Sequence, residues 1–371
     1  MNGTVVSYLA QYEFFDILTG LFGENSLLLT FIIFIAFAGI FVAVAATIGG
    51  LGTYAERKIS ADIQMRIGPN RVGPYGLLQF LADGVKMIMK EDIMPNSADK
   101  MLFYLAPLLC LVGVFATLAV FPVSSGFILT DLNVGVFYLI AISSLVGLGV
   151  FLGGYASNSK WSMLGGMRGA SQIISYEIPV TISVLAITLL AGSMSFGSII
   201  AKQEGFLTNW FIFHNPFAFI AFFVYFVGAL AETNRAPFDL PEAESELVSG
   251  YHTEYTGMRF GFFALAEYIE VFVVSGVAAA LFLGGYNLPF KLEVDMIPVQ
   301  LVQVSIIVAK SLALYYVVIW VRWTFPRLRV DQLMSICWKY LTPIAIFNLV
   351  GCAVWMVVFK GQSMAQLLMG H

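Results

Sequence analysis

The chain has 371 residues, of which 59% are hydrophobic and only 11% are charged. Soluble domains carry about a quarter charged residues, so this chain has too few charges to cover a water-exposed surface. Its formal net charge of −4 gives no electrostatic basis for binding nucleic acid. Composition therefore predicts an integral membrane protein and excludes a soluble enzyme, a disordered chain and a nucleic-acid-binding protein.

The three cysteines and three histidines are widely separated in the sequence. No Cys-x-x-Cys or His-Glu-x-x-His spacing is present to hold an iron–sulfur cluster, a haem or zinc. No glycine-rich motif for binding a nucleotide is present either. The sequence thus predicts that this chain binds no metal and no covalently attached cofactor, so any redox centre must belong to other chains.

A helix that crosses a bilayer needs roughly 20 mainly apolar residues. Eight segments reach this length with few or no charges. In chain order they are residues 25–55, 101–130, 132–159, 178–201, 205–231, 259–284, 299–321 and 341–359. The predicted fold is an all-α integral membrane protein with eight transmembrane helices, and we expect residues 1–371 to form a single polytopic membrane domain.

Positive charge predicts the orientation, because cytoplasmic loops of membrane proteins are enriched in Lys and Arg. With eight spans, the loops 54–100, 157–171, 231–259 and 322–340 share one side and hold 15 of the 19 Lys and Arg residues. We therefore expect these loops to be cytoplasmic and both termini to lie on the outer, periplasmic side. No basic n-region or cleavage pattern of a removable signal peptide is present. A bacterial inner membrane, or an organellar one in a eukaryote, is the expected location.

The first long loop, residues 54–100, combines tight turns with balanced charge. Two Gly-Pro pairs shape its backbone, and residues 80–89 have the pattern of an amphipathic interfacial helix. The loop carries six acidic and seven basic residues. A loop that only anchors topology would need the basic set alone, so this balance indicates a structured surface.

The second long loop, residues 231–259, is acidic: six carboxylates accompany two arginines around a Pro-x-x-x-Pro segment. Solvated helix ends account for Glu244. They account poorly for Glu232, which closes a long uncharged run, and for Glu254, which lies among aromatic residues.

Four further charges fall within or beside the apolar segments: Glu177, Glu267, Glu270 and Lys310. Each ionised group near the bilayer centre costs on the order of 3 kcal/mol or more. A structural ion pair between spans, such as Lys310 with Glu267, is one explanation. A series of carboxyl groups that exchange protons near neutral pH is the other. The sequence leaves open whether Glu270 and Lys310 are structural or functional.

Four stretches carry a family resemblance: residues 56–74 and on to 83, 175–177, 231–244 and 254–260. Together they resemble the H-type membrane subunit of respiratory complex I (NADH-quinone oxidoreductase), the counterpart of mitochondrial NADH dehydrogenase subunit 1. The resemblance implies eight membrane helices, an anchor for the hydrophilic arm, and a membrane wall for the quinone chamber. It also implies that an acidic chain couples quinone reduction to proton translocation.

The resemblance further implies the substrate and the partners. The substrate is a quinone, ubiquinone or menaquinone, whose tail enters from the bilayer and whose headgroup approaches an iron–sulfur cluster supplied by a neighbouring subunit. The partners are the hydrophilic iron–sulfur and quinone-site subunits, the small and antiporter-like membrane subunits, and lipid. The chain would be a subunit of a proton-translocating enzyme with no redox centre, no catalytic residue and no activity of its own.

We assign two sets of site residues on this basis. Residues expected to shape the quinone chamber and its docking surface are Glu56, Arg57, Lys58, Arg66, Arg71, Asp83, Phe238 and Asp239. Residues expected to form the proton relay are Glu177, Glu232, Glu242, Glu244, Glu246, Glu254 and Glu267. The physical reason is that a charge created in a medium of low dielectric constant shifts the pKa values of neighbouring carboxyl groups.

Three other functions remain open. A related subunit of a membrane-bound hydrogenase or formate-linked complex would share the fold and the buried acids but would not use quinone. A stand-alone ion-coupled transporter would transport its substrate when reconstituted alone. A passive structural anchor would tolerate neutralisation of every buried acid.

Overall fold

The computed structural model divides into two compact units, Met1–Thr47 and Ile48–His371. The residues it describes are 27–126, 128–242, 244–288, 299–359, 362 and 364. Both chain ends, whose side of the membrane the charge pattern predicts, lie outside these ranges. The description below therefore concerns the helix that begins in the first unit and the helical bundle of the second.

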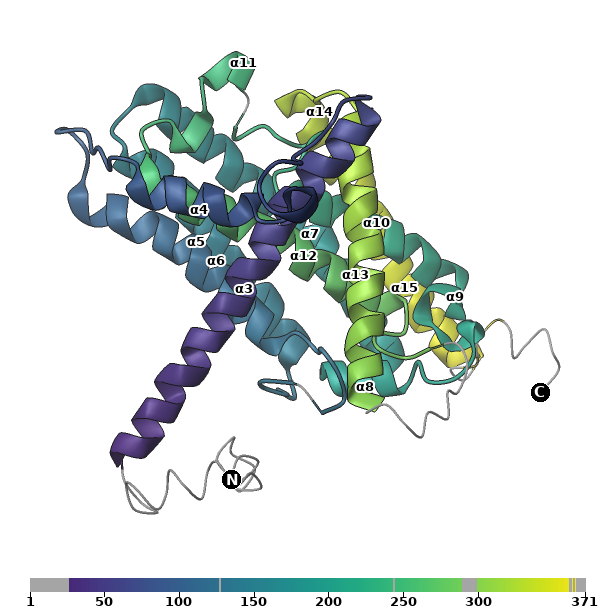
Figure 1. Cartoon of the computed structure of the whole chain (residues 1–371). Coiled ribbons are helices and arrows are strands. Elements are labelled where there is room, and N and C mark those ends of the chain that lie inside the picture. The colour runs from purple at the N-terminus through teal and green to yellow at the C-terminus, as the bar shows by residue number, and fades with distance from the viewer. Residues whose placement is uncertain are drawn as a thin grey trace. The chain divides into compact units, whose positions relative to one another are not determined.

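The described residues are helical and contain no strand (Figure 1). The helices of ten or more residues are α3 (Leu27–Ile63), α4 (Gln79–Met89), α5 (Lys100–Val120), α6 (Gly135–Ala156), α7 (Lys160–Ala191), α10 (Pro216–Glu232), α12 (Gly257–Phe282), α13 (Val299–Thr324) and α15 (Thr342–Val358). Shorter helices are α8 (Phe196–Ala201), α9 (Phe211–His214), α11 (Glu244–Leu247) and α14 (Val330–Ser335). Single turns are η1 (Pro74–Gly76), η2 (Leu207–Asn209), η3 (Gly250–His252) and the π-helical η4 (Ile336–Leu341).

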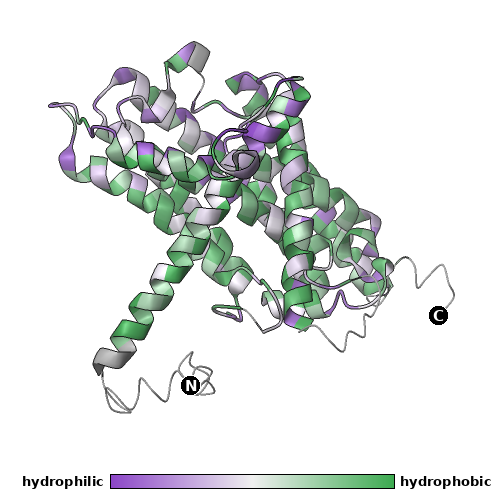
Figure 2. Cartoon of the chain, viewed as in Figure 1, coloured by the Kyte–Doolittle hydropathy of each residue, from purple (hydrophilic) through white to green (hydrophobic). Residues whose placement is uncertain are grey.

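Seven helices in the described ranges are long and apolar enough to cross a membrane; the last of them is the continuous run of α14, η4 and α15, Val330–Val358. Figure 2 shows that hydrophobic residues run along the helices, while hydrophilic ones gather mainly at helix ends and in loops. The prediction of an all-α integral membrane protein is confirmed. The count of eight spans is not, because the helix at the fifth predicted span, α10, has 17 residues, the lower limit for a crossing, and is not among the seven.

Two of the helix boundaries that differ from the sequence prediction place a candidate site residue inside a helix. Helix α3 continues to Ile63, so Glu56 lies in a helix and not in the first loop. Helix α7 begins at Lys160 and includes Glu177, whereas the apolar pattern suggested a span only from residue 178. Both helices extend into stretches that contain charged residues. This is possible because the hydrogen bonds of a helix join backbone groups and do not depend on apolar side chains.

Glycines let α6 pack closely against its neighbours. A Cβ atom on Gly149 would overlap the Cys110 sulfur of α5, and one on Gly154 would lie 2.9 Å from the Gly166 Cα of α7. Small residues at such contacts are the usual means by which helices associate in lipid, since they let the backbones approach.

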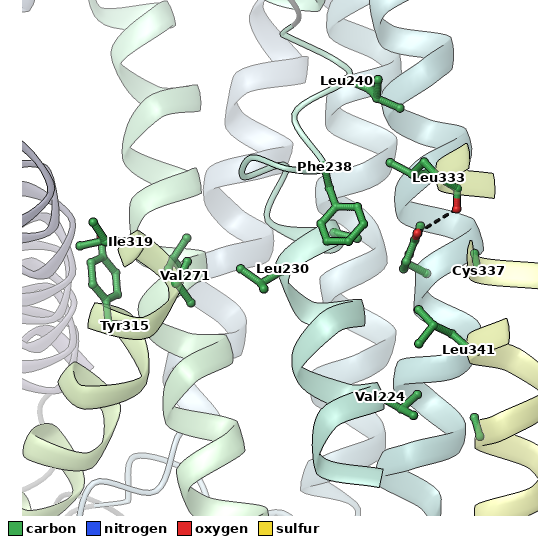
Figure 3. Packing of buried hydrophobic residues seen from close by; sticks show 14 of the residues in the cluster. Val224, Leu230, Phe238, Leu240, Val271, Tyr315, Ile319, Leu333, Cys337 and Leu341 are labelled. Atoms are coloured by element: carbon green, nitrogen blue, oxygen red, sulfur yellow. Dashed lines mark hydrogen bonds between the residues drawn. The ribbon is translucent and has the colours of Figure 1, made fainter. Parts of the chain in front are cut away.

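A cluster of buried apolar residues holds the segment after α10 against α7, α13 and α14. Figure 3 shows Phe238 and Leu333 in this cluster. The Tyr176 ring lies 5.6 Å from that of Phe238, and its hydroxyl donates to the Leu333 carbonyl at 2.9 Å. The cluster therefore fixes the start of the second loop on the helical bundle.

Pro179 explains a further contact of α7. Proline has no N–H, so the Ser175 carbonyl four residues earlier lacks its helical donor. The Cys337 thiol of η4 donates to that carbonyl at 3.0 Å. The proline thus leaves one carbonyl of α7, two residues before Glu177, without a helical donor, and the π-helical turn η4 supplies the donor.

Candidate functional site

Arg235 is the centre of a buried group of charges. Its Nη1 donates to Glu56 Oε2 of α3 at 2.8 Å, and its Nε lies 2.9 Å from Glu267 Oε1 of α12. The guanidinium also lies 4.3 Å from the centre of the Tyr268 ring. Only 4% of the Arg235 side chain is exposed. One cation therefore joins α3, α12 and the second loop.

A second arginine completes this group. Arg322, at the end of α13, donates to Glu56 Oε1. We call Glu56, Arg235, Glu267 and Arg322 the buried charge cluster. Its two carboxylates and two guanidiniums balance in formal charge, so the cluster avoids the large cost of an unpaired buried ion.

Asp239 and Arg327 form a neighbouring pair. Arg327 Nη2 donates to Asp239 Oδ2 at 2.7 Å, and the Asp239 side chain is 9% exposed. Burial and the nearby Glu242 raise the pKa of Asp239 to about 6, although Arg327 works in the opposite direction. Asp239 therefore titrates close to neutral pH.

Gln172 of α7 fixes the irregular segment that carries these residues. Its Nε2 lies within hydrogen-bonding distance of three acceptors in that segment, namely Ala231 O at 2.8 Å, Phe238 O at 2.7 Å and Asn234 Oδ1 at 3.2 Å. The Gln172 side chain is buried. Because backbone carbonyls away from water need donors, this carboxamide replaces the hydrogen bonds that a regular helix would have supplied.

Further along the second loop, Glu242 faces His252. Glu242 Oε1 lies 3.2 Å from His252 Nε2 and accepts from the Tyr251 hydroxyl at 3.5 Å. Burial works to raise the pKa of Glu242, but its hydrogen bond and charge interaction with His252 lower it below the ordinary value. Glycine at 250 permits this fold: its φ is +62°, and a Cβ there would overlap the Pro241 carbonyl oxygen.

The expected residues of the first loop lie at a more exposed place. Arg57 donates to Asp83, which also accepts from Gln79 Nε2 at 3.2 Å. Lys58 Nζ donates to the Pro69 carbonyl at 3.4 Å. Helix α4 is thereby tied to the end of α3.

The structure brings together some of the expected site residues and leaves others apart. Glu246 pairs with Arg168 at 2.6 Å. Arg66 donates a hydrogen bond to Gln64 Oε1 at 2.7 Å. Arg66, Arg71 and Glu254 make no ion pair with a described residue. Of Glu244 the structure describes the backbone alone.

Glu177 and Glu232 occupy different settings. Glu177 is half-buried on α7, and Glu232, the last residue of α10, is buried with 9% of it exposed. Neither carboxyl has a hydrogen bond or ion pair within the described part of the chain. These two acids therefore differ from Glu267, which has Arg235 beside it.

Lys310 does not pair with Glu267. Its Nζ donates to three carbonyls that follow α12, those of Leu283, Gly285 and Asn287, at 2.7 to 2.8 Å. It also lies 4.2 Å from the centre of the Trp210 ring. Since helix C-termini leave carbonyls without donors and attract cations, this contact is a structural cap.

The sequence did not single out Arg322, Arg327 or Gln172. The two arginines entered only the count of positive loop charges. A usable signal was their place directly after a span, where a long side chain can reach back to a buried carboxylate. No comparable signal marked Gln172.

No group of three or more His, Cys, Asp and Glu side chains that could hold a metal ion occurs among the described residues. The polar groups gathered at the site are carboxylates, guanidiniums and amides. Such groups can stabilise a nearby negative charge, and the carboxylates can also accept and release protons.

Comparison with known proteins adds independent information. The family model described as "NADH dehydrogenase" matches residues 35–353. The H-type subunit of NADH-quinone oxidoreductase from Chlorobium luteolum is 46% identical over 92% of this chain and 93% of that protein. The proteins of the same name from Bacillus cytotoxicus and Anaeromyxobacter dehalogenans are 49% and 44% identical, over 85% and 86% of this chain and 92% and 81% of those proteins.

Proposed function

Because the chain belongs to the NADH dehydrogenase family of membrane subunits, we propose that it forms the membrane wall of a quinone chamber and links quinone reduction to proton translocation. It is a multi-pass membrane subunit of an NADH-quinone oxidoreductase. In this proposal the electrons come from an iron–sulfur cluster in a neighbouring hydrophilic subunit, and this chain contributes no redox centre.

The observation that carries the proposal is the double contact of Arg235 with Glu56 and Glu267. Negative charge formed on a quinone beside the second loop competes with these carboxylates for the buried guanidinium. In a medium of low dielectric constant such competition is felt over several ångströms. A weaker interaction between Arg235 and Glu267 favours the protonated form of Glu267. Reduction of the quinone thereby leads to proton uptake by a carboxyl group of α12.

The loop residues supply the entrance to this path. We assign the exposed set around Arg57, Lys58 and Asp83 to the chamber mouth and its docking surface, with Arg66 and Arg71 beside it. Phe238 and Asp239 belong to the chamber wall, and Asp239 supports this assignment because its pKa of about 6 lets it exchange a proton near neutral pH. Glu242, Glu244, Glu246 and Glu254 form the acidic rim.

From there, Glu177, Glu232 and Glu267 carry the change into the bundle. The bias of Lys and Arg toward the loops supports a cytoplasmic position for the chamber and a periplasmic position for both termini. The partners are the hydrophilic quinone-site subunits on that side and the small and antiporter-like subunits in the membrane. Bacterial relatives support placement in a bacterial inner membrane.

The proposal is tested with Glu267→Gln in the complete complex, purified and reconstituted in vesicles. We expect quinone-coupled proton translocation to fall on the order of tenfold or more, because a proton-accepting group is lost. NADH oxidation by an artificial acceptor remains unchanged, because its redox centres lie in other subunits. Glu204→Gln, at an exposed carboxylate, is the matched control. Translocation at the wild-type level in Glu267→Gln would remove Glu267 from the relay.

A further inference from the structure

A cavity of about 30 Å³ lies inside the helical bundle, apart from the buried charge cluster. Its walls come from α5, α6, α7, α8, α10 and α12 and are mostly valines and other apolar residues. Two carboxyl groups face it, Glu232 from the end of α10 and Glu270 from the middle of α12. Glu270 belongs to none of the roles proposed above.

The hydroxyl groups on the cavity wall are already occupied as donors. Thr117 Oγ1 donates to the Val114 carbonyl at 2.8 Å, and Ser143 Oγ donates to the Ile140 carbonyl at 2.8 Å. The Tyr225 hydroxyl donates to a carbonyl of α12 at 3.1 Å. Among the described residues, therefore, none of these three hydroxyls donates to Glu232 or Glu270.

The nearby cation Arg235 does not pair with either of these two carboxyl groups. Arg235 contacts Glu56 and Glu267, and the Glu270 carboxyl has no ion pair or hydrogen bond in the described ranges. Glu232 is nine-tenths buried and likewise has none. A largely buried polar group without a partner is costly, so these two carboxyl groups need a ligand that the described residues do not supply.

Water fits this requirement in size and chemistry. A water molecule needs roughly 10–15 Å³ of such space and two to four polar partners, so the cavity admits about two. Two carboxyl groups, with hydroxyl oxygens free to accept, provide those partners. Electrostatics disfavours two negative charges in one small apolar cavity, as in other carboxyl pairs that share a site.

We propose that this cavity is a hydrated proton site in which Glu270 shares a proton with Glu232. A proton leaves the Glu232 carboxyl for a cavity water while that water gives a proton to the Glu270 carboxylate, so Glu232 ends as carboxylate and Glu270 as acid. The inference rests on the proposed relay through Glu232 and extends it one carboxyl deeper. On α12, the walls continue from Glu270 to Val277, a rise of roughly 10 Å along the helix.

The first test is infrared difference spectroscopy of the whole complex in lipid, titrated over pH. The carbonyl stretch of a protonated buried carboxyl group is the readout, and it needs no turnover. We expect Glu270→Gln to remove or shift one such band, while Glu204→Gln leaves the spectrum unchanged. An unaltered band pattern in Glu270→Gln overturns the shared-proton site.

The second test is functional and uses two variants of different kind. Glu270→Gln removes the carboxyl group, whereas Ser143→Leu keeps both carboxyls and fills the cavity that holds the water. We expect either change to lower proton translocation per NADH oxidised on the order of tenfold or more, because one positioned proton-transfer group typically contributes about 10²–10⁴-fold. Wild-type translocation in both variants overturns the inference.

The two tests separate this inference from the proposed function. If Glu267→Gln pumps normally but Glu270→Gln still loses its infrared band, the proton site stands and the relay through Glu267 fails. If Glu267→Gln stops pumping while the Glu270 variant keeps both band and pumping, the cavity site fails and the proposed function stands.

Discussion

Two cations in the second unit, the buried Arg235 and the half-buried Lys310, are held in opposite ways. Arg235 contacts two carboxylates, Glu56 and Glu267, beside the acidic second loop. Lys310 lies beyond the other end of α12 and contacts three backbone carbonyls but no carboxylate among the described residues.

The difference lies in what can change. A carboxylate beside an arginine loses its charge when it binds a proton, so the Arg235 contacts depend on charge elsewhere in the site. Backbone carbonyls do not titrate, so the acceptors of Lys310 cannot be neutralised by a proton as a carboxylate can. We infer that the first region responds to chemistry and the second holds α12 in place.

The largest expected effect comes from breaking the first region. Arg235→Met leaves Glu56 with only Arg322 and leaves Glu267 with no cation, and removal of one partner of a buried ion pair costs about 3–5 kcal/mol. We expect little assembled complex in membranes and a lowered Tm for what assembles. Arg235→Lys, which keeps a positive charge, is the control, and adding Glu267→Gln to Arg235→Met should restore part of the loss. Normal assembly of Arg235→Met would contradict the comparison.

Breaking the second region should affect stability alone. Lys310→Met removes three charge-assisted hydrogen bonds, and leaving buried acceptors unpaired costs about 3 kcal/mol. We expect a lower Tm of the complex but an unchanged ratio of protons translocated to NADH oxidised. Lys339→Met, at an exposed position, controls for the loss of a charge. A changed ratio in Lys310→Met would place Lys310 in the relay.

The smallest effect concerns Asp239, at the edge of the first region. Its pKa is about 6 in the folded chain against an ordinary value of 3.8. Between these two values, the folded state keeps a proton that the unfolded state has released, so stability falls as pH rises from 4 to 6, by at most about 3 kcal/mol. Asp239→Asn removes this dependence.

We therefore expect the Tm of Asp239→Asn, relative to that of the wild type, to increase as pH rises from 4 to 7. The measurement is thermal unfolding of the complex at a series of pH values. A difference in Tm that stays constant with pH would show that the Asp239 carboxyl titrates normally.

Much of the fold could be predicted from the sequence. Long apolar stretches require helices in lipid, because a backbone there must satisfy its own hydrogen bonds. At residues 205–231 the apolar pattern predicted too long a helix. Helix α10 begins only at Pro216, with Asn215 as its N-cap. The single turn η2 and the short helix α9 take up the apolar residues of this segment that precede α10.

The candidate site was only partly predictable. Because an ionised group in the membrane is energetically costly, the sequence indicates that Glu267 needs a partner or a proton. It does not indicate which residue the partner is. Arg235 and Glu56 are separated by 179 residues and Arg322 and Glu56 by 266, and no local pattern encodes pairing at such distances. Alternatives such as Lys310 with Glu267 were equally consistent with the sequence, and only the packing of α12 against α13 excludes that pair.

The contact between Gly250 and Pro241 has a consequence for the whole acidic loop. A Cβ atom at Gly250 would lie 1.6 Å from the Pro241 carbonyl oxygen, so not even one methyl group fits there. A Cβ atom at Gly165 of α7 would lie 2.7 Å from the Tyr251 nitrogen, which is also too close. Because glycine has no side chain, these segments can pack in direct contact. A single added carbon at Gly250 would force this turn away from Pro241 and so disturb the contact between His252 and Glu242.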